Sequence, residues 1–202
     1  MKNSIVIIGA GGHGKVVADT ALLCGYSKVI FLDDSDNCSV KVSGKTSDYT
    51  KYVNDCDFFI AIGNNTVRES ITNNITNNGA DIAIVIHPSA VVGRNVNIGV
   101  GSFVAAGSVI NTDTNIGRGT ILNTCCSVDH DCTVEDYCHI SVGSHLAGTV
   151  KVGKKTFVGA GATVINNISI CDDCTIGAGA VVVKNITDKG TYVGVPAKKI
   201  KT

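Results

Sequence analysis

The sequence lacks both an excess of one charge and a long run of apolar residues. Its 202 residues include 17 basic and 17 acidic ones, and no cluster of Lys and Arg stands out. This balance argues against nucleic acid or an anionic membrane surface as a partner. The apolar run at residues 5–8 is too short for a signal peptide or a membrane span. We therefore expect a cytoplasmic protein that handles a small soluble ligand.

The chain also lacks a second Cys-x-x-Cys pair. Of its nine cysteines, Cys171 and Cys174 have the spacing of a metal or redox pair. A tetrahedral zinc site needs further ligands, and no second such pair supplies them. Several other cysteines fall where small residues recur, and a free Cys there behaves as a compact apolar residue. A structural role is favoured for most of them.

Apolar residues recur at every sixth position through the second half of the chain. From Val92 to Val182 each sixth residue is Val, Ile or Leu for sixteen hexads without a slip. This period is that of neither a helix nor an ordinary strand, so it predicts stacked repeat units that share one core. The position four residues later is usually small, as at Ser102 and Cys126. Glycine often follows the aliphatic residue, which we attribute to a sharp turn there. The pattern predicts a β-solenoid of roughly five coils.

The N-terminal third has the pattern of a β-α-β unit. It predicts a strand at 5–8, a glycine-rich turn at 9–14, a helix at 16–23 and a second strand at 29–32. Gly9, Gly11 and Gly14 satisfy the G-x-G-x-x-G pattern, and Asp33 and Asp34 follow the second strand. This combination is typical of nucleotide-binding sheets. The glycine pattern alone is explained by tight backbone packing as well as by ligand binding.

Too few strands follow for a complete dinucleotide-binding domain. Only residues 58–62 and 82–86 have strand character, with one helix near 66–77 between them. A mononucleotide therefore fits better than NAD. His13 and Gly63 would then lie at the carboxyl ends of parallel strands, where ligands bind in open α/β sheets. The polar segment 35–55 is expected to be a loop with one short helical turn.

One hexad of the repeat differs chemically from the rest. It places His130 between Asp129 and Asp131, at positions that do not face the core. Neighbouring carboxylates favour the imidazolium and raise the basicity of the histidine. A base of this kind can accept a proton near neutral pH. The alternative is a solvated charged turn.

Three histidines within sixteen residues, His130, His139 and His145, raise the hypothesis of a zinc site. Trimeric solenoids such as the γ-class carbonic anhydrases bind zinc between subunits, but two of their histidines are five residues apart and the third lies far upstream. The spacings of nine and six in this chain differ from that pattern. We therefore expect no metal.

Several segments together resemble one family, the sialic acid O-acetyltransferases and nucleotide-amino-sugar N-acetyltransferases, with the bacillosamine N-acetyltransferases nearest. The resemblance covers essentially the whole chain and rests on residues 9–14, 31–34, 61–65, 121–124, 130–131, 139–143 and 194–198. It implies two domains. The first, over residues 1–86, is an α/β Rossmann-like half domain that binds a nucleotide sugar. The second, over residues 87–202, is a left-handed parallel β-helix of hexapeptide repeats.

The resemblance also implies a reaction. Members of this family transfer acetyl from acetyl-CoA to the 4-amino group of a nucleotide-linked deoxy-sugar, for surface glycan biosynthesis. The histidine matching His130 is the general base, and the acid matching Asp131 increases its basicity. The family often has Glu at the second position, and Asp is one methylene shorter. Backbone N–H groups can stabilise the oxyanion that develops as the amine attacks the thioester.

Further site residues follow from the same resemblance. The nucleotide sugar would be held by Gly11, Gly12, His13, Asp33, Asp34 and Gly63. Acetyl-CoA, the co-substrate, would contact His139, Ala160 and Ala178, with Asn123 and the backbone at Gly148 as helpers on the carbonyl side. No metal or redox cofactor is implied. The family forms homotrimers with the sites in the grooves between subunits.

Three alternatives stay open. O-acetylation of a sialic acid would use the same His130, although a hydroxyl is a poorer nucleophile, and the pairs His130-Asp131 and Asp33-Asp34 resemble the N-acetylating branch more. A metal-dependent lyase on the same solenoid is disfavoured by the histidine spacing. A non-catalytic nucleotide-sugar binder would keep its ligand when His130 is replaced by Ala, whereas an acetyltransferase would lose turnover and still bind both substrates.

Overall fold

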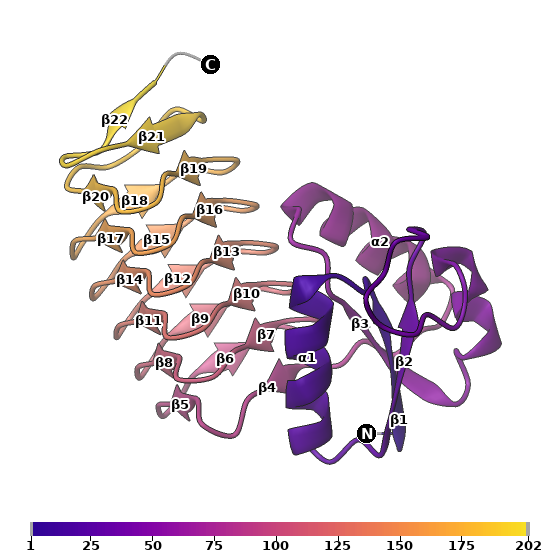
Figure 1. The fold of residues 1–202 in the computed structure, drawn as a ribbon. Helices are drawn as coiled ribbons and strands as arrows, with labels where there is room; N and C mark the ends of the chain where they lie inside the picture. The colour runs from indigo at the N-terminus through magenta and orange to yellow at the C-terminus, as the bar shows by residue number, and fades with distance from the viewer. Residues whose placement is uncertain (1, 201–202) are drawn as a thin grey trace. The chain divides into compact units, whose positions relative to one another are not determined.

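The computed structural model describes residues 2–200 and consists of two compact units, with the boundary between Pro88 and Ser89. The first unit is an α/β layer and the second is a solenoid of short stacked strands (Figure 1). Each unit is described by itself.

The first unit is built on a parallel sheet of three strands in the order β2-β1-β3. Its elements are β1 (Ser4–Ile8), α1 (Gly12–Leu23), β2 (Lys28–Leu32), the 3-10 helix η1 (Thr46–Lys51), β3 (Cys56–Ile60), α2 (Asn65–Asn77) and β4 (Val85–Ile86). All of β3 and four of the five residues of β1 are buried, as expected for a parallel sheet covered on both faces. The predicted β-α-β unit, the second helix and the short helical turn within 35–55 are confirmed.

The predicted strand at 82–86 is wrong as a continuous element. Ile82 forms an isolated parallel bridge with Phe58, and β4 contains only two residues. The backbone of Phe58 makes two hydrogen bonds of 2.8 Å, to Asp81 and Ala83, and β3 pairs no further along this segment. The apolar residues at 82–86 are therefore divided between a single bridge to β3 and the separate strand β4, which is not part of this sheet.

The second unit contains sixteen two-residue strands between Val91 and Val182, each ending on one of the predicted aliphatic residues. They are β5 (Val91–Val92), β6 (Asn97–Ile98), β7 (Phe103–Val104), β8 (Val109–Ile110), β9 (Asn115–Ile116), β10 (Ile121–Leu122), β11 (Ser127–Val128), β12 (Thr133–Val134), β13 (His139–Ile140), β14 (His145–Leu146), β15 (Lys151–Val152), β16 (Phe157–Val158), β17 (Thr163–Val164), β18 (Ser169–Ile170), β19 (Thr175–Ile176) and β20 (Val181–Val182). Then follow β21 (Thr191–Val193) and β22 (Lys198–Lys199).

The short strands stack in register into three faces (Figure 1). Face 1 contains β7, β10, β13, β16, β19 and β21; face 2 contains β5, β8, β11, β14, β17 and β20; face 3 contains β6, β9, β12, β15 and β18. Ile121 on β10 pairs with His139 on β13, so one coil has 18 residues. We call the turns from face 1 to face 2 the first corner, from face 2 to face 3 the second corner, and from face 3 to face 1 the third corner.

The small-residue position explains how the coils are held together inside. Residues such as Ser102, Thr120 and Cys138 are fully buried, yet each donates a hydrogen bond to a carbonyl of the next coil. The donor to acceptor distances are 2.9 Å from Ser102 Oγ to Gly117 O, 3.1 Å from Thr120 Oγ1 to Glu135 O and 3.0 Å from Cys138 Sγ to Gly153 O. Small polar side chains are therefore tolerated in an apolar core because their donors are satisfied.

The explanation given for the recurrent glycines is wrong. The glycines directly after the aliphatic residue, such as Gly93 and Gly159, do not have a left-handed φ. A Cβ on Gly159 would lie 2.7 Å from the backbone N of Ala178, in the next coil. Glycine is needed there because neighbouring coils approach closely. The left-handed φ falls two residues later, as at Asp131 (+57°) and Lys155 (+55°).

Candidate functional site

His130 and Asp131 form the turn at the second corner between β11 and β12. Nδ1 of His130 lies 2.7 Å from Oδ2 of Asp131, and about half of each side chain is exposed. The hydrogen bond to Asp131, followed by the charge of Asp129, raises the pKa of His130 above its usual value. An ionised carboxylate only accepts hydrogen bonds, so Nδ1 carries the proton and Nε2 of the neutral ring is the basic nitrogen. The shorter Asp side chain thus still contacts His130.

Gly148, one coil further along the same corner, provides the surface on which the His130 ring lies. A Cβ at residue 148 would be 2.6 Å from Cε1 and 2.7 Å from Nε2 of His130. The backbone of Gly148 does not have a left-handed φ, so the ring is the reason for glycine here. The backbone N of Thr149 also donates to His130 O at 2.9 Å. The predicted helper Gly148 therefore lies directly against the predicted base.

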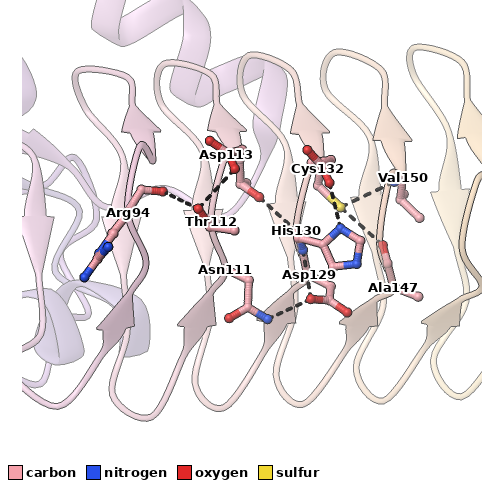
Figure 2. A network of polar contacts seen from close by, with 11 residues as sticks. Arg94, Asn111, Thr112, Asp113, Asp129, His130, Cys132, Ala147 and Val150 are labelled. Atoms are coloured by element: carbon pink, nitrogen blue, oxygen red, sulfur yellow. Dashed lines mark hydrogen bonds and ion pairs between the residues drawn. The ribbon is translucent and has the colours of Figure 1, made fainter.

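A ladder of polar side chains fixes the backbone of this turn (Figure 2). Nδ2 of Asn111 donates to Oδ1 of Asp129 at 2.7 Å, and the same oxygen accepts the backbone N–H of His130 at 2.8 Å. These two bonds lower the pKa of Asp129 and keep it ionised beside the imidazole. Sequence reasoning missed Asn111, although its distance of one coil of 18 residues from Asp129 would have identified it.

A shallow open pocket lies beside the His130 ring. Its lining is polar and small, and comes from three consecutive coils: Asp129, His130, Ala147, Gly148, Thr149, Asn166 and Asn167. The basic nitrogen therefore lies where a ligand from solvent can reach it, as a general base requires.

The predicted coenzyme contacts gather at the first corner instead. Nδ2 of Asn123 lies 3.1 Å from Nε2 of His139, whose ring packs edge-on against Phe157 at 5.1 Å between centroids. Ala160 and Ala178 are exposed turn residues one coil apart. Both are small, and we call the row that they form along this corner the open strip. Within one chain the candidate residues thus form two groups, at the two corners that border face 2.

The glycine loop of the first unit contains glycines of two kinds. Gly9 has φ of +108°, and a Cβ there would lie 2.8 Å from Ala61 O, while a Cβ on Gly14 would collide with Gly9 O. These two are explained by folding. A Cβ on Gly11 or Gly12 would meet nothing within 4 Å. Their missing side chains leave open space before the first turn of α1, which begins at Gly12.

The two acids after β2 hold the loops around this space. Oδ2 of Asp33 accepts the backbone N–H of Ala10 in the glycine loop at 2.6 Å, and Oδ1 of Asp34 accepts that of Thr46 at 2.8 Å. Asp33 also lines a pocket together with Asp36, Lys45 and neighbouring residues. Asp33 therefore fixes the shape of the glycine loop, a role that spacing alone did not reveal.

Arg68 on α2 organises the loop that contains Gly63. Its buried guanidinium donates to Ile62 O at 2.8 Å, to Gly63 O at 3.3 Å and to Oδ1 of Asn65 at 2.8 Å. Burial, followed by the charge of Arg68, lowers the pKa of His13 to about 4. His13 is therefore a neutral imidazole at neutral pH. Sequence reasoning missed Arg68, since one Arg on a helix carries no signal that it is buried.

The three histidines of the zinc hypothesis lie on different parts of the solenoid. His130 is at the second corner, His139 is on face 1, and His145 is on face 2 with Nδ1 2.8 Å from Oγ of Ser127. Across residues 2–200, no group of three or more His, Cys, Asp or Glu side chains is arranged to hold a metal ion. Neither described helix has the length and hydrophobicity needed to cross a bilayer.

Comparisons with known proteins place these features in one family. Residues 4–75 match the PglD N-terminal domain, and residues 149–184 match the bacterial transferase hexapeptide of six repeats. The acetyltransferase domain of PglB from Neisseria gonorrhoeae FA1090, solved with acetyl coenzyme A, is 38% identical, with a TM-score of 0.95 over 99% of this chain and 100% of that one. The chain belongs to the nucleotide-amino-sugar N-acetyltransferase family.

Two further relatives are informative. A histidine variant of perosamine N-acetyltransferase from Caulobacter crescentus, solved with CoA and GDP-perosamine, is 38% identical, with a TM-score of 0.93 over 98% of this chain and 97% of that one. UDP-N-acetylbacillosamine N-acetyltransferase from Bacillus subtilis is 34% identical over 115 residues, 52% of each chain. The predicted family, the α/β half domain followed by a left-handed parallel β-helix, and the acetyl-CoA-dependent enzyme class are confirmed.

Proposed function

We propose that this protein transfers acetyl from acetyl-CoA to the 4-amino group of a nucleotide-linked amino-deoxy-sugar, with His130 as general base, in surface glycan biosynthesis. The observation that carries the proposal is the His130-Asp131 pair on Gly148, which leaves a basic Nε2 beside an open pocket. Family membership supports the substrate class, since the names of two of the relatives described above specify amino sugars carried by GDP or UDP.

The proposed acetyl transfer has two steps. The amine attacks the thioester carbonyl, a C–N bond forms, and the amine proton passes to Nε2 of His130. The C–S bond then breaks, and CoA leaves as a thiol when the imidazolium of His130 gives the proton to its sulfur. The raised pKa of His130 improves the base, and ionised Asp129 and Asp131 stabilise the imidazolium that forms. Asn123, near His139, is proposed to help on the carbonyl side.

The separation of the two groups supports a site shared between subunits. The proposed coenzyme residues His139, Ala160 and Ala178 lie at or beside one border of face 2, and His130 lies at the other border. If face 2 of each chain turns toward a three-fold axis, the first corner of one chain meets the second corner of the next. We therefore propose a homotrimer with three sites, in which pantetheine lies along the open strip at the first corner.

The first unit is proposed to hold the nucleotide sugar. Gly11, Gly12 and Gly63 each leave open space, because a Cβ at any of them would meet no atom of the chain within 4 Å. Backbone N–H groups at the start of α1 face such a space and suit an anionic diphosphate. Neutral His13 and the loop acids Asp33 and Asp34 complete the proposed contacts.

The test is release of CoA thiol from acetyl-CoA with a panel of GDP-, UDP- and dTDP-linked 4-amino-deoxy-sugars, and with free sialic acid as the O-acetylation control. Turnover on one amino sugar, lost in His130→Ala while both substrates still bind, is the expected result. Release with sialic acid alone would replace the proposal by O-acetylation. Binding without release on any acceptor would indicate a nucleotide-sugar binder.

A further inference from the structure

Cys171 and Cys174 form a pair of thiols at the third corner, apart from both groups of candidate residues. Cys171 follows β18, Cys174 precedes β19, and Asp172 and Asp173 form the turn between them. Both cysteines are free, and their Sγ atoms lie 3.5 Å apart. The first and second corners carry the proposed chemistry, so this pair is a separate feature of the same solenoid.

The fold brings these cysteines to the separation that a disulfide spans. The two ends of a β-turn lie less than about 7 Å apart at Cα. A disulfide typically joins Cα atoms about 4.4–6.8 Å apart. Asp173 already has the left-handed φ of +56° that closes the turn, and the two Sγ atoms are already 3.5 Å apart. We propose that Cys171 and Cys174 are a site of reversible thiol oxidation, which closes to an intramolecular disulfide by exchange with a low-molecular-weight disulfide such as oxidised glutathione.

The two cysteines have different roles in this exchange. Cys171 is partly exposed, whereas Cys174 is 1% exposed. The Cys171 thiolate attacks oxidised glutathione, forms a mixed disulfide and releases one glutathione. Cys174 then loses its proton to solvent, attacks Sγ of Cys171 and releases the second glutathione. The protein loses two protons and two electrons, which reduce one oxidised glutathione to two thiols.

Burial limits the second step. Burial, together with the hydrogen bond to Cys171, raises the pKa of the Cys174 thiol to about 12. Only the thiolate attacks a disulfide, so the burial of Cys174 slows closure. The mixed disulfide on Cys171 should therefore be seen early in a time course and should decline as the intramolecular disulfide accumulates.

The chain after β20 rests on this turn. The backbone N–H of Cys171 donates to Ile186 O at 2.9 Å, and that of Thr175 donates to Gly190 O at 2.9 Å. Tyr192 Oη donates to Asp188 O at 2.7 Å, and Cys174 Sγ lies 3.9 Å from the same carbonyl. A disulfide at 171–174 would tie the corner against which residues 186–192 pack.

The experiment follows oxidation by mass. The native protein is incubated with oxidised glutathione at mildly alkaline pH, quenched with acid, alkylated and digested with trypsin. The tryptic peptide 156–184 contains Cys171 and Cys174 and no other cysteine. We expect this peptide two hydrogen atoms lighter than its reduced form and without alkyl groups. Dithiothreitol added before alkylation should restore two alkylated thiols.

Three controls make the result decisive. Cys174→Ser should trap the glutathione adduct on Cys171, and Cys171→Ser should leave Cys174 unmodified. Cys38, a partly exposed cysteine alone in its tryptic peptide 29–41, should show at most the adduct. A 171–174 disulfide that is no more stable toward glutathione in the native protein than in concentrated urea would overturn the proposal, because the fold would then contribute nothing. A stable adduct on wild-type Cys171 without closure would also overturn it.

Discussion

Replacing Gly148 by Ala tests directly whether the position of the His130 ring matters. The new Cβ would lie 2.6 Å from Cε1 of the ring. Carbon atoms in contact normally lie about 3.5–4.0 Å apart, so the ring must move by about 1 Å. A displacement of about 1 Å at a reacting group can cost roughly 100-fold in rate. We expect kcat/KM to fall by about that factor.

The same substitution should leave the fold intact. Residue 148 does not have a left-handed φ, so its backbone accepts Ala without strain. Gly→Ala at a compatible position stabilises a protein by about 0.4–1 kcal/mol through the unfolded state. The obstacle is the free end of a half-exposed side chain, which can turn away. Thermal unfolding should therefore show no loss of stability.

The assay is thiol release under subsaturating acceptor, with wild type, Gly148→Ala, His130→Ala and the double variant. In the His130→Ala background, Gly148→Ala should have no further effect, because the ring it displaces is gone. Full activity in Gly148→Ala would refute the reasoning. A further large loss in the double variant would instead assign Gly148 a role of its own.

Three other substitutions probe the base, the subunit arrangement and the first unit. Asp131→Asn removes the main cause of the raised His130 pKa, so the acidic limb of the kcat/KM pH profile should move to lower pH and the plateau should fall; an unmoved limb would contradict His130 as the titrating base. Two inactive variants, His130→Ala and Ala160→Arg, should regain activity when unfolded and refolded as a mixture, in about one quarter of the sites of a trimer; no recovery would place the site within one chain. Arg68→Met should lower the free energy of unfolding in urea by about 1–3 kcal/mol for each carbonyl that loses its donor, and should raise KM for the nucleotide sugar more than KM for acetyl-CoA, with partial rescue by Lys.

The β-solenoid could be predicted from the sequence because aliphatic residues at a single six-residue period specify all of its coils. Each aliphatic residue from Val92 to Val182 lies at the end of a short strand, as the six-residue period predicts. The strand predicted at 82–86 was wrong because apolar composition does not specify which strand each residue pairs with. The glycines after the aliphatic residues were noticed, but their cause is a contact between coils, which a pattern along one coil cannot show.

Some residues of the candidate site could be predicted from the sequence, and others could not. His130 was identified because it is a histidine between two carboxylates, and its contact with Asp131 is between neighbours in sequence. Asn111 and Gly148 act on it from the coils before and after. Arg68 matters through burial, which arises only when α2 packs on its sheet. Contacts of this kind depend on three-dimensional stacking and carry little signal in one sequence.

The 18-residue coil has a consequence for how such a chain can change length. A deletion of six residues between His130 and Ala160 would keep the aliphatic period unbroken, yet it would rotate everything that follows by one third of a turn. Ala160 would then move to the third corner, away from both groups of candidate residues. A deletion of a whole coil would preserve the corners and change only the height between the two groups, by about 4.8 Å. The six-residue pattern thus does not determine at which corner a given residue lies. The proposed site therefore tolerates only insertions or deletions of whole coils.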